Sequence, residues 1–322
     1  MGRFLIRRLL LAIVVLFGVT SLTYLMMTAA AGNYVPGLDL QGQIRPEDID
    51  RLRVSLGLDR PVHIQYLSWM SGILQGDFGR SMIDGSTVVS NLGQRLPNTL
   101  LLSLTSLVIG VFGGVVMGVA SALNRGRFLD RAFSVVAVAG FAIPQFWLGL
   151  ILILIFAVGF RSWGLPALPS SGAFDPVSGG GFADRILHLI LPAATLSFVY
   201  LSVWSRYVRS SMITALSEDY VRTARSKGLR EVRVVFGHAF RNAVMPLVTL
   251  IGLEFPRLVS GSLVVEVIYG WPGVGRFAYE RALAYDYTSV MGVTAFVAVM
   301  VVFGSLVADI GYGMADPRIK YE

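Results

Sequence analysis

A stretch without a single charged residue decides the fold of this chain: residues 99–123 read TLLLSLTSLVIGVFGGVVMGVASAL. At a rise of about 1.5 Å per residue, a helix of this length crosses the roughly 30 Å hydrocarbon core of a bilayer. Small residues at helical spacing let a second helix approach closely, and the stretch carries Gly110, Gly113, Gly114 and Gly118. We therefore expect a transmembrane helix that packs tightly against a neighbour.

The composition extends this expectation to the whole chain. Of its 322 residues, 54% are hydrophobic and only 15% are charged, which leaves too little polar surface to cover a soluble globule. We therefore expect an all-α polytopic membrane protein with about six transmembrane helices, in which Pro144 and Pro192 kink the third and fourth spans. The candidate spans are residues 9–31, 99–123, 132–158, 186–208, 244–269 and 289–312.

The cysteine and histidine counts argue against a metal centre. The chain has no cysteine, which excludes disulfides and thiolate-bound metals, and its three histidines are widely spaced. The net charge of +7 could suggest a nucleic acid, but basic residues gathered in loops are what membrane topology alone produces. We therefore expect no cofactor in this chain, no nucleic acid partner, and membrane lipid around the spans.

The placement of arginine and lysine predicts the orientation, because short loops rich in these residues stay in the cytoplasm. Six spans put both termini, the connection after the second span and the segment after the fourth span on one side. Both termini are therefore predicted to be cytoplasmic. The basic residues on that side include Arg3, Arg7, Arg8, Arg125, Arg127, Arg131, Arg209, Arg222, Arg225, Lys227, Arg230, Arg233, Arg318 and Lys320.

The same pattern divides the chain into three parts. Residues 1–31 form an N-terminal transmembrane helix; they also resemble a signal peptide, but the apolar run is longer than usual, which favours an uncleaved helix. Residues 32–98 form an extended exterior loop, and residues 99–322 form a five-helix core. In the loop, apolar residues recur with helical period from Val62, which suits a helix on the outer membrane face or on the transmembrane bundle.

The cytoplasmic segment at residues 209–243 of the core predicts a pair of helices. Ser217 is a candidate N-cap, Glu218 and Asp219 favour the helix dipole, and Gly228 marks a break. A rigid, densely charged helix pair favours a docking surface for a soluble partner over a loop that only holds topology. In the second helix an apolar stripe is expected at Val232, Val235, Phe236, Ala239, Phe240 and Ala243.

At this segment the sequence resembles a known family. Residues 219–229 read DYVRTARSKGL and continue through HAFRNA at 238–243, which is similar to the EAA loop of permease subunits in binding-protein-dependent ABC importers. Other segments resemble the dipeptide and oligopeptide branch of that family, and the ordered set is similar to the first, B-type, peptide permease. These segments are QYL at 65–67, GDFG at 76–79, IPQFWLG at 143–149, WPGVG at 271–275 and DPRI at 316–319.

The likeness covers nearly the whole chain, with one departure. The glutamate and first alanine of the triplet that names the loop are Arg222 and Thr223 here. Because peptide-branch permeases commonly differ at these positions, the departure bears on contact details and leaves the class unchanged.

The resemblance implies a fold, a place and partners. It implies the type I ABC importer permease fold in a bacterial inner membrane, a homologous second permease, two cytoplasmic ATPase subunits and an extracytoplasmic substrate-binding protein. It also implies that the short helix inserts into a cleft on an ATPase subunit and moves with it. The docking residues would be Tyr220, Arg222, Thr223, Ala224, Arg225, Ser226, Lys227, Gly228 and Leu229.

The ATP-hydrolysing motor is expected in another polypeptide. A phosphate-binding P-loop needs glycine directly before lysine, and the chain's two lysines, Lys227 and Lys320, follow Ser226 and Ile319. We therefore expect a transport subunit that is not itself an enzyme, with ATP and magnesium bound to the partner ATPase subunits.

Four ionisable residues within or at the ends of apolar spans are candidates for the substrate pathway or gate: Glu254, Arg257, Glu266 and Asp309. Glu254 and Arg257 are three residues apart, so they could instead neutralise each other on one helix face. In the family that the chain resembles, the region from Glu266 to Gly275 lies near the outer mouth.

Several alternatives stay open at this point. Relatives of the same scaffold carry nickel chelates, haem, glutathione or oligosaccharides, so peptides are one substrate class among several. A secondary transporter also has six or more spans with a few buried charges, although inverted repeats are not evident. An intramembrane protease would need a serine and a histidine brought together, and the candidates lie in different segments.

Overall fold

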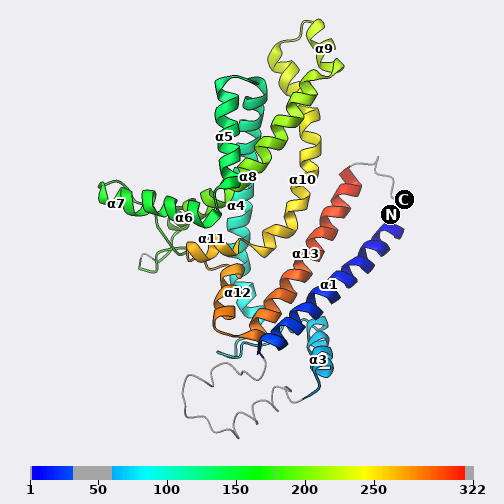
Figure 1. Ribbon diagram of the computed structural model, residues 1–322, viewed down its shortest axis with the longest axis vertical. Coiled ribbons are helices and arrows are strands. Elements are labelled where there is room, and N and C mark those ends of the chain that lie inside the picture. Colours follow the sequence, from blue (N-terminus) through cyan, green and yellow to red (C-terminus); the bar gives the residue numbers. More distant parts are fainter. Residues whose placement is uncertain (1, 32–59, 178, 316–322) are drawn as a thin grey trace. The chain divides into compact units, whose positions relative to one another are not determined.

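The computed structural model describes residues 2–31, 60–177 and 179–315, which are mostly helical (Figure 1). Within these residues there is no β-strand, only an isolated bridge between Arg80 and Thr87, so the all-α prediction is confirmed. The helices are α1 (Gly2–Ala31), α3 (Val62–Leu74), α4 (Val88–Leu123), α5 (Phe128–Ala142), α6 (Gln145–Leu152), the π-helix η1 (Ile153–Gly159), α7 (Phe160–Ser162), α8 (Phe182–Ser217), α9 (Asp219–Ser226), the π-helix η2 (Arg233–Phe240), α10 (Arg241–Ser260), α11 (Leu263–Ile268), α12 (Val274–Leu283) and α13 (Tyr287–Ala315).

Helices suited to a membrane dominate the described residues. Five are long and apolar enough to cross a bilayer: Ile6–Ala29, Val88–Leu123, Gln145–Ser162, Phe182–Ser217 and Tyr287–Ala308. Helices α4 and α8 have 36 residues each, or about 54 Å at 1.5 Å per residue. Both are therefore longer than the roughly 30 Å hydrocarbon core and extend beyond it. Helix α4 also begins eleven residues before the start predicted for the second span, since it begins at Val88 and not at Thr99.

The third predicted span is broken. Ile143 and Pro144 adopt extended backbone conformations between α5 and α6, and α6 runs in a different direction from α5 (Figure 1). The cause is local, because proline lacks an amide hydrogen and disfavours a helical conformation at the preceding residue. By contrast, α8 continues through Pro192 without a break, and the kink expected at this proline stays a prediction.

The fifth predicted span ends early. Helix α10 ends at Ser260, and Gly261 takes a φ of 68° and a ψ of −176°, a conformation that essentially only glycine adopts. Helix α11 then begins afresh, with the Ser262 side chain accepting a hydrogen bond from the backbone N–H of Val265. The break falls at Ser260-Gly261-Ser262, a turn signal that the hydropathy reading passed over because the apolar runs on either side are long enough to look like one span.

The chain forms two compact units, within residues 1–97 together with 273–322 and within residues 98–272. The C-terminal helices therefore group with the N-terminal part of the chain and not with the rest of the predicted core. In this first unit α1 packs along α13 (Figure 1). Its buried core joins Val88 and Leu92 of α4 to Phe277 of α12 and Val293 of α13.

A buried carboxylate ties the segment before α4 to the same unit. Asp286, between α12 and α13, is fully buried, and it accepts hydrogen bonds from the Ser81 hydroxyl at 2.6 Å and the Met82 N–H at 3.1 Å. The Ser289 hydroxyl donates a third bond at 2.7 Å, and the Arg281 guanidinium lies 3.5 Å away. Because a buried carboxylate needs such donors, this part of the expected exterior loop is held in a defined fold.

In the second unit, glycines of α4 let α8 approach closely, as predicted. A Cβ on Gly114 would lie 2.6 Å from the Trp204 Cβ, and one on Gly118 would lie 2.6 Å from the Val208 Cβ. Both distances are shorter than packed atoms allow. In lipid, where apolar burial does not drive association, such backbone proximity supplies the contacts that hold two helices together.

The two neighbouring glycines Gly113 and Gly114 provide a matched test of this packing. A Cβ on Gly113 would meet only the Leu201 Cδ1 at 2.9 Å, the flexible end of a side chain, whereas one on Gly114 also meets backbone, the Ser205 N at 3.0 Å. We expect Gly114→Ala to destabilise the protein by about 1–3 kcal/mol through overpacking, and Gly113→Ala to be neutral or slightly stabilising. Thermal unfolding of the purified chain in detergent measures both. Equal melting temperatures for the two variants would show that α4 and α8 do not pack in this way.

Candidate functional site

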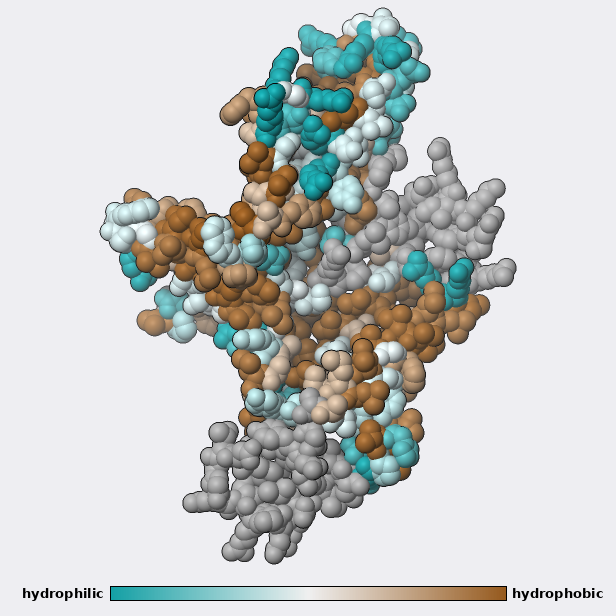
Figure 2. Space-filling view, in the orientation of Figure 1, coloured by the Kyte–Doolittle hydropathy of each residue, from teal (hydrophilic) through white to brown (hydrophobic). Residues whose placement is uncertain are grey.

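The candidate site is the helix pair at one end of the second unit. Helix α8 leads to the short helix α9, and the chain returns through η2 into α10 (Figure 1). Hydrophilic side chains gather on the surface around α9 (Figure 2). The sequence predicted this helix, but Ser217 does not cap it, because its hydroxyl donates to the Thr214 carbonyl within α8 at 2.7 Å and Glu218 occupies the N-cap position.

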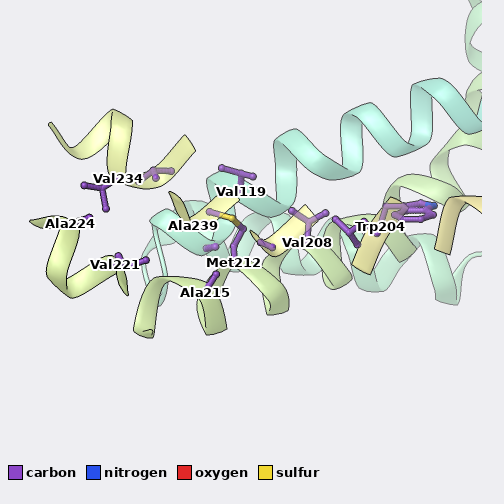
Figure 3. Close-up of a cluster of buried hydrophobic side chains, with 13 residues drawn as sticks. Val119, Trp204, Val208, Met212, Ala215, Val221, Ala224, Val234 and Ala239 are labelled. Carbon is purple, nitrogen blue, oxygen red and sulfur yellow. The ribbon is translucent and has the colours of Figure 1, made fainter. Parts of the chain in front are cut away.

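The inner face of α9 is buried against its own chain. Val221 is fully buried, and Ala224 is 5% exposed. Both belong to an apolar cluster with Met212 of α8 and with Val234 and Val235 of η2 (Figure 3). Ala224 was predicted as part of a docking surface, and the structure turns it inward. Its small size therefore allows α9 and η2 to pack closely.

Gly228 closes the turn between the two helices. Its φ of 73° lies in the left-handed region, where glycine has no steric penalty. The Gly228 N–H donates to the Arg225 carbonyl at 2.9 Å, and the Leu229 N–H approaches the Ala224 carbonyl at 3.4 Å. This is the Schellman pattern, and the half-buried Leu229 packs against the apolar cluster, a contact that often accompanies this motif. The predicted helix–glycine–helix organisation is confirmed.

An ion pair spans the same turn. The Arg225 guanidinium donates to both carboxylate oxygens of Glu231, at 2.6 and 3.2 Å. The hydrogen bond from Arg225 holds the pKa of Glu231 below its ordinary value. Because both side chains are about half exposed, such a pair contributes at most about 1 kcal/mol. Its effect is to fix geometry, since a two-point contact restrains the angle between α9 and the following helix.

The outer face of α9 is accessible. Most of the residues predicted to dock a partner lie there or in the turn that follows: Tyr220, Arg222, Thr223, Arg225, Ser226 and Lys227 are exposed. The charge on this face is mixed, since the Arg222 guanidinium lies 3.2 Å from the carboxylate of Asp219, one turn earlier. The helix thus has an apolar inner face bound to its own chain and a polar, largely basic outer face.

The sequence missed two exposed apolar residues beside α9. Val232 and Phe236 were assigned to the same apolar stripe as Val235, Ala239, Phe240 and Ala243, yet they are 71% and 54% exposed. The other four residues of the stripe are buried or half-buried. A helical period of 3.6 residues was assumed, whereas η2 is a π-helix with a wider turn, so residues that share a face in an α-helix separate here. Their exposure adds an apolar patch to the polar surface of α9.

A second ion pair anchors the helix that carries α9. Arg209 of α8 donates to both carboxylate oxygens of Asp130 in α5, at 2.7 and 2.9 Å, and the hydroxyl of Ser121 in α4 also bonds the carboxylate. Asp130 is buried, and the hydrogen bond from Arg209 holds its pKa well below the ordinary value. Because the Arg209 side chain is 33% exposed, removing one partner should cost less than the about 3–5 kcal/mol typical of a fully buried pair. Sequence reasoning did not single out Asp130, although an acid among basic loop residues was a usable signal.

The four predicted pathway residues lie in different environments. Glu266 in α11 is fully buried, and it accepts a hydrogen bond from the Thr99 hydroxyl of α4 at 2.9 Å. This interior position supports a structural role. Glu254 is half-buried in α10. The side chains of Arg257 and Asp309 lie outside the described residues, so pairing of Glu254 with Arg257 stays a prediction.

Comparison with known proteins places the chain in a family. A model of the inner membrane component of binding-protein-dependent transport systems matches residues 114–321, and a companion model of the N-terminal part of such components matches residues 1–105. The chain belongs to this family of transport permeases. The permease is 41% identical to the oligopeptide transport system permease protein AppB of Bacillus subtilis over the full length of both chains.

Two further relatives and a solved structure agree with this assignment. The permease is 37% identical to the di/tripeptide transport system permease protein DppB of Pseudomonas aeruginosa over 99% of each chain, and 35% identical to the dipeptide transport system permease protein DppB of Escherichia coli K12 over the whole of both. The crystal structure of an amino acid ABC transporter with histidines superposes with a TM-score of 0.53 at 17% identity, over 70% of this chain and 94% of that one. That likeness concerns the fold, which is the predicted type I permease fold.

The Gly228 turn gives a direct test of the geometry of the permease's helix pair. No atom lies within 4 Å of a Cβ built on Gly228, so a substitution there meets open space, and only the backbone conformation is strained. We expect Gly228→Val to loosen the attachment of α9, with a cost of at least about 1–2 kcal/mol, and Gly228→Asn to cost less because asparagine tolerates this region. Hydrogen exchange of the α9 amides should be faster in the valine variant. Equal protection in both variants would rule out strain at Gly228 as the constraint.

Proposed function

We propose that the permease is one half of the translocation pathway of an ATP-driven peptide importer. Family membership supports binding-protein-dependent transport, and relatives that match the full chain are named as oligopeptide, di/tripeptide and dipeptide permeases. Peptides vary in sequence and length, so the path they take should be wide and weakly selective, with specificity left to the binding protein. A chain with about six spans is then one wall of a passage that a homologous second permease completes.

The coupling to ATP is proposed to occur through α9. The observation that carries this proposal is the division of α9 into an inner face buried in its own chain and an exposed outer face. A helix that is held on one side and accessible on the other can transmit the motion of a partner without bending. On this proposal the outer face of α9 docks into a cleft on one of the two ATPase subunits. The corresponding helix of the second permease docks into the other ATPase subunit.

The chemistry of ATP hydrolysis is assigned to those subunits. ATP and magnesium bind there, and the permease supplies no catalytic residue. Both termini and α9 are assigned to the cytoplasmic side, since the basic residues concentrate in these segments. The substrate-binding protein is assigned to the opposite face of the membrane.

Co-purification tests the proposed function. The tagged permease, extracted from its native membrane, should bring down two ATPase subunits and a second permease, identified by mass spectrometry. ATP hydrolysis by the reconstituted complex should rise when peptide-loaded binding protein is added, and peptide-free binding protein is the control. Recovery of the chain without any ATPase would contradict the proposal, and stimulation only by a non-peptide ligand would overturn the substrate class alone.

The buried position of Ala224 generates a second expectation. A larger side chain cannot fit between α9 and η2, so Ala224→Leu should displace α9 from its cluster. We expect this variant to remain in the membrane while ATP hydrolysis no longer responds to loaded binding protein and uptake falls. Ala224→Ser, which keeps the small volume, is the matched control and should transport normally. Normal uptake by the leucine variant would refute the role of this packing in coupling.

A further inference from the structure

Helix α3 presents an unusual surface for a segment outside the transmembrane helices. None of its 13 residues is buried. The stretch from residue 61 to residue 76 contains no Asp, Glu, Lys or Arg, and charges appear only beyond it, at Arg60 and Asp77. Helix α3 is too short to cross a membrane and mixes apolar residues with His63, Gln65, Ser68 and Ser71, so it is either part of a core or a segment at the membrane. The absence of buried residues excludes the core alternative for α3.

The contacts of α3 set its depth relative to α1. The Tyr66 hydroxyl and the Ser21 hydroxyl are 2.8 Å apart, and the Tyr24 hydroxyl donates to the Gln65 side chain at 3.1 Å. The Tyr66 ring also packs edge-on against Phe17, with 6.3 Å between ring centres. These contacts attach α3 to the C-terminal half of α1.

That part of α1 lies within the hydrocarbon layer. If the midpoint of the apolar stretch Ile6–Ala29 is placed at the bilayer midplane, Phe17 lies at the midplane and Tyr24 about 10 Å beyond it, at 1.5 Å per residue. The hydrocarbon layer extends about 15 Å from the midplane, and any tilt of α1 brings Tyr24 closer to it. Tyr66, which contacts both residues, is therefore inside the hydrocarbon layer.

The two faces of α3 match such a position. The polar ends of Gln65 and Tyr66 face α1 and are hydrogen-bonded to it, which suits a position in lipid, whereas the indole N–H of Trp69 is buried without a hydrogen-bond partner. The opposite side carries Ile64, Leu67 and Leu74, spaced three and seven residues apart along one helix face and 40%, 62% and 82% exposed, with the small exposed residues Ser68 and Ser71 among them. This face continues the exposed apolar surface of α1, on which Leu22 is 60% exposed.

We infer that α3 is embedded in the leaflet that contains the C-terminal half of α1, with Leu67 and Leu74 in contact with acyl chains. The occupant of this face is lipid. Helix α3 thereby anchors the segment that leads to Ser81 and Asp286, which the first unit holds in a fixed arrangement. The inference does not depend on the transported substrate or on the coupling to ATP.

Spin labels test this inference in the full chain reconstituted in lipid nanodiscs. The chain has no cysteine, so Leu67→Cys and Leu74→Cys each give a single labelled site. Leu22→Cys on α1 is the reference for lipid, and Val177→Cys, at a position 94% exposed in the loop between α7 and α8, is the reference for water. Collision of each label with oxygen, which partitions into lipid, is compared with collision with a water-soluble nickel chelate.

The expected result is a ratio of oxygen to nickel collision at Leu67 and Leu74 that matches Leu22 and exceeds Val177 several-fold. A ratio that matches Val177 would place α3 in water and overturn the inference. Low collision rates with both reagents would mean that protein covers this face, which overturns it as well. If Leu67→Cys fails to fold, the more exposed Leu74 position decides the outcome.

Discussion

Every role proposed for α9 depends on the burial of its inner face against its own chain. Val221 and Ala224 pack against η2 and the end of α8, and the left-handed conformation of Gly228 sets the angle at which they meet. Without this burial, an eight-residue helix would be marginal in water, because helices of that length are unstable in isolation. The same burial leaves the polar outer face as the side that a partner can reach.

The anchoring of α8 extends this rigidity away from α9. The ion pair of Arg209 and Asp130 joins α8 to α5, and the glycines of α4 let α4 pack closely along α8. A displacement at α9 is therefore imposed on packed helices and not absorbed by a loop. Close-packed elements of this kind shift as units. On the proposed docking of α9, a movement of the ATPase subunit would in this way reach the membrane-spanning helices.

The sequence predicted features that depend on local chemistry, such as the glycine turn at Gly228, the close approach at Gly114 and the helix that begins at Val62. It failed where tertiary structure decides. The grouping of α13 with α1 joins distant parts of the chain. The inward position of Ala224 and the exposure of Phe236 likewise follow from how α9 and the π-helix η2 pack. The break at Pro144, where only a kink was expected, and the break at Gly261 have local causes, but the long apolar runs around them made each span look continuous to hydropathy.

The most direct test of the central claim is a distance measurement between α9 and the helix that follows it. Spin labels at Asp219, the first residue of α9, and at Val232, both exposed and outside the predicted docking residues, can be introduced into the cysteine-free permease. The labelled permease is assembled with its ATPase partners and measured by pulsed electron resonance. If the helix pair is rigid, the distance distribution stays narrow and does not change between the nucleotide-free state and a state trapped during ATP hydrolysis. A distribution that broadens or shifts between these states would show that α9 moves on its own chain and would contradict its role as a rigid coupling element.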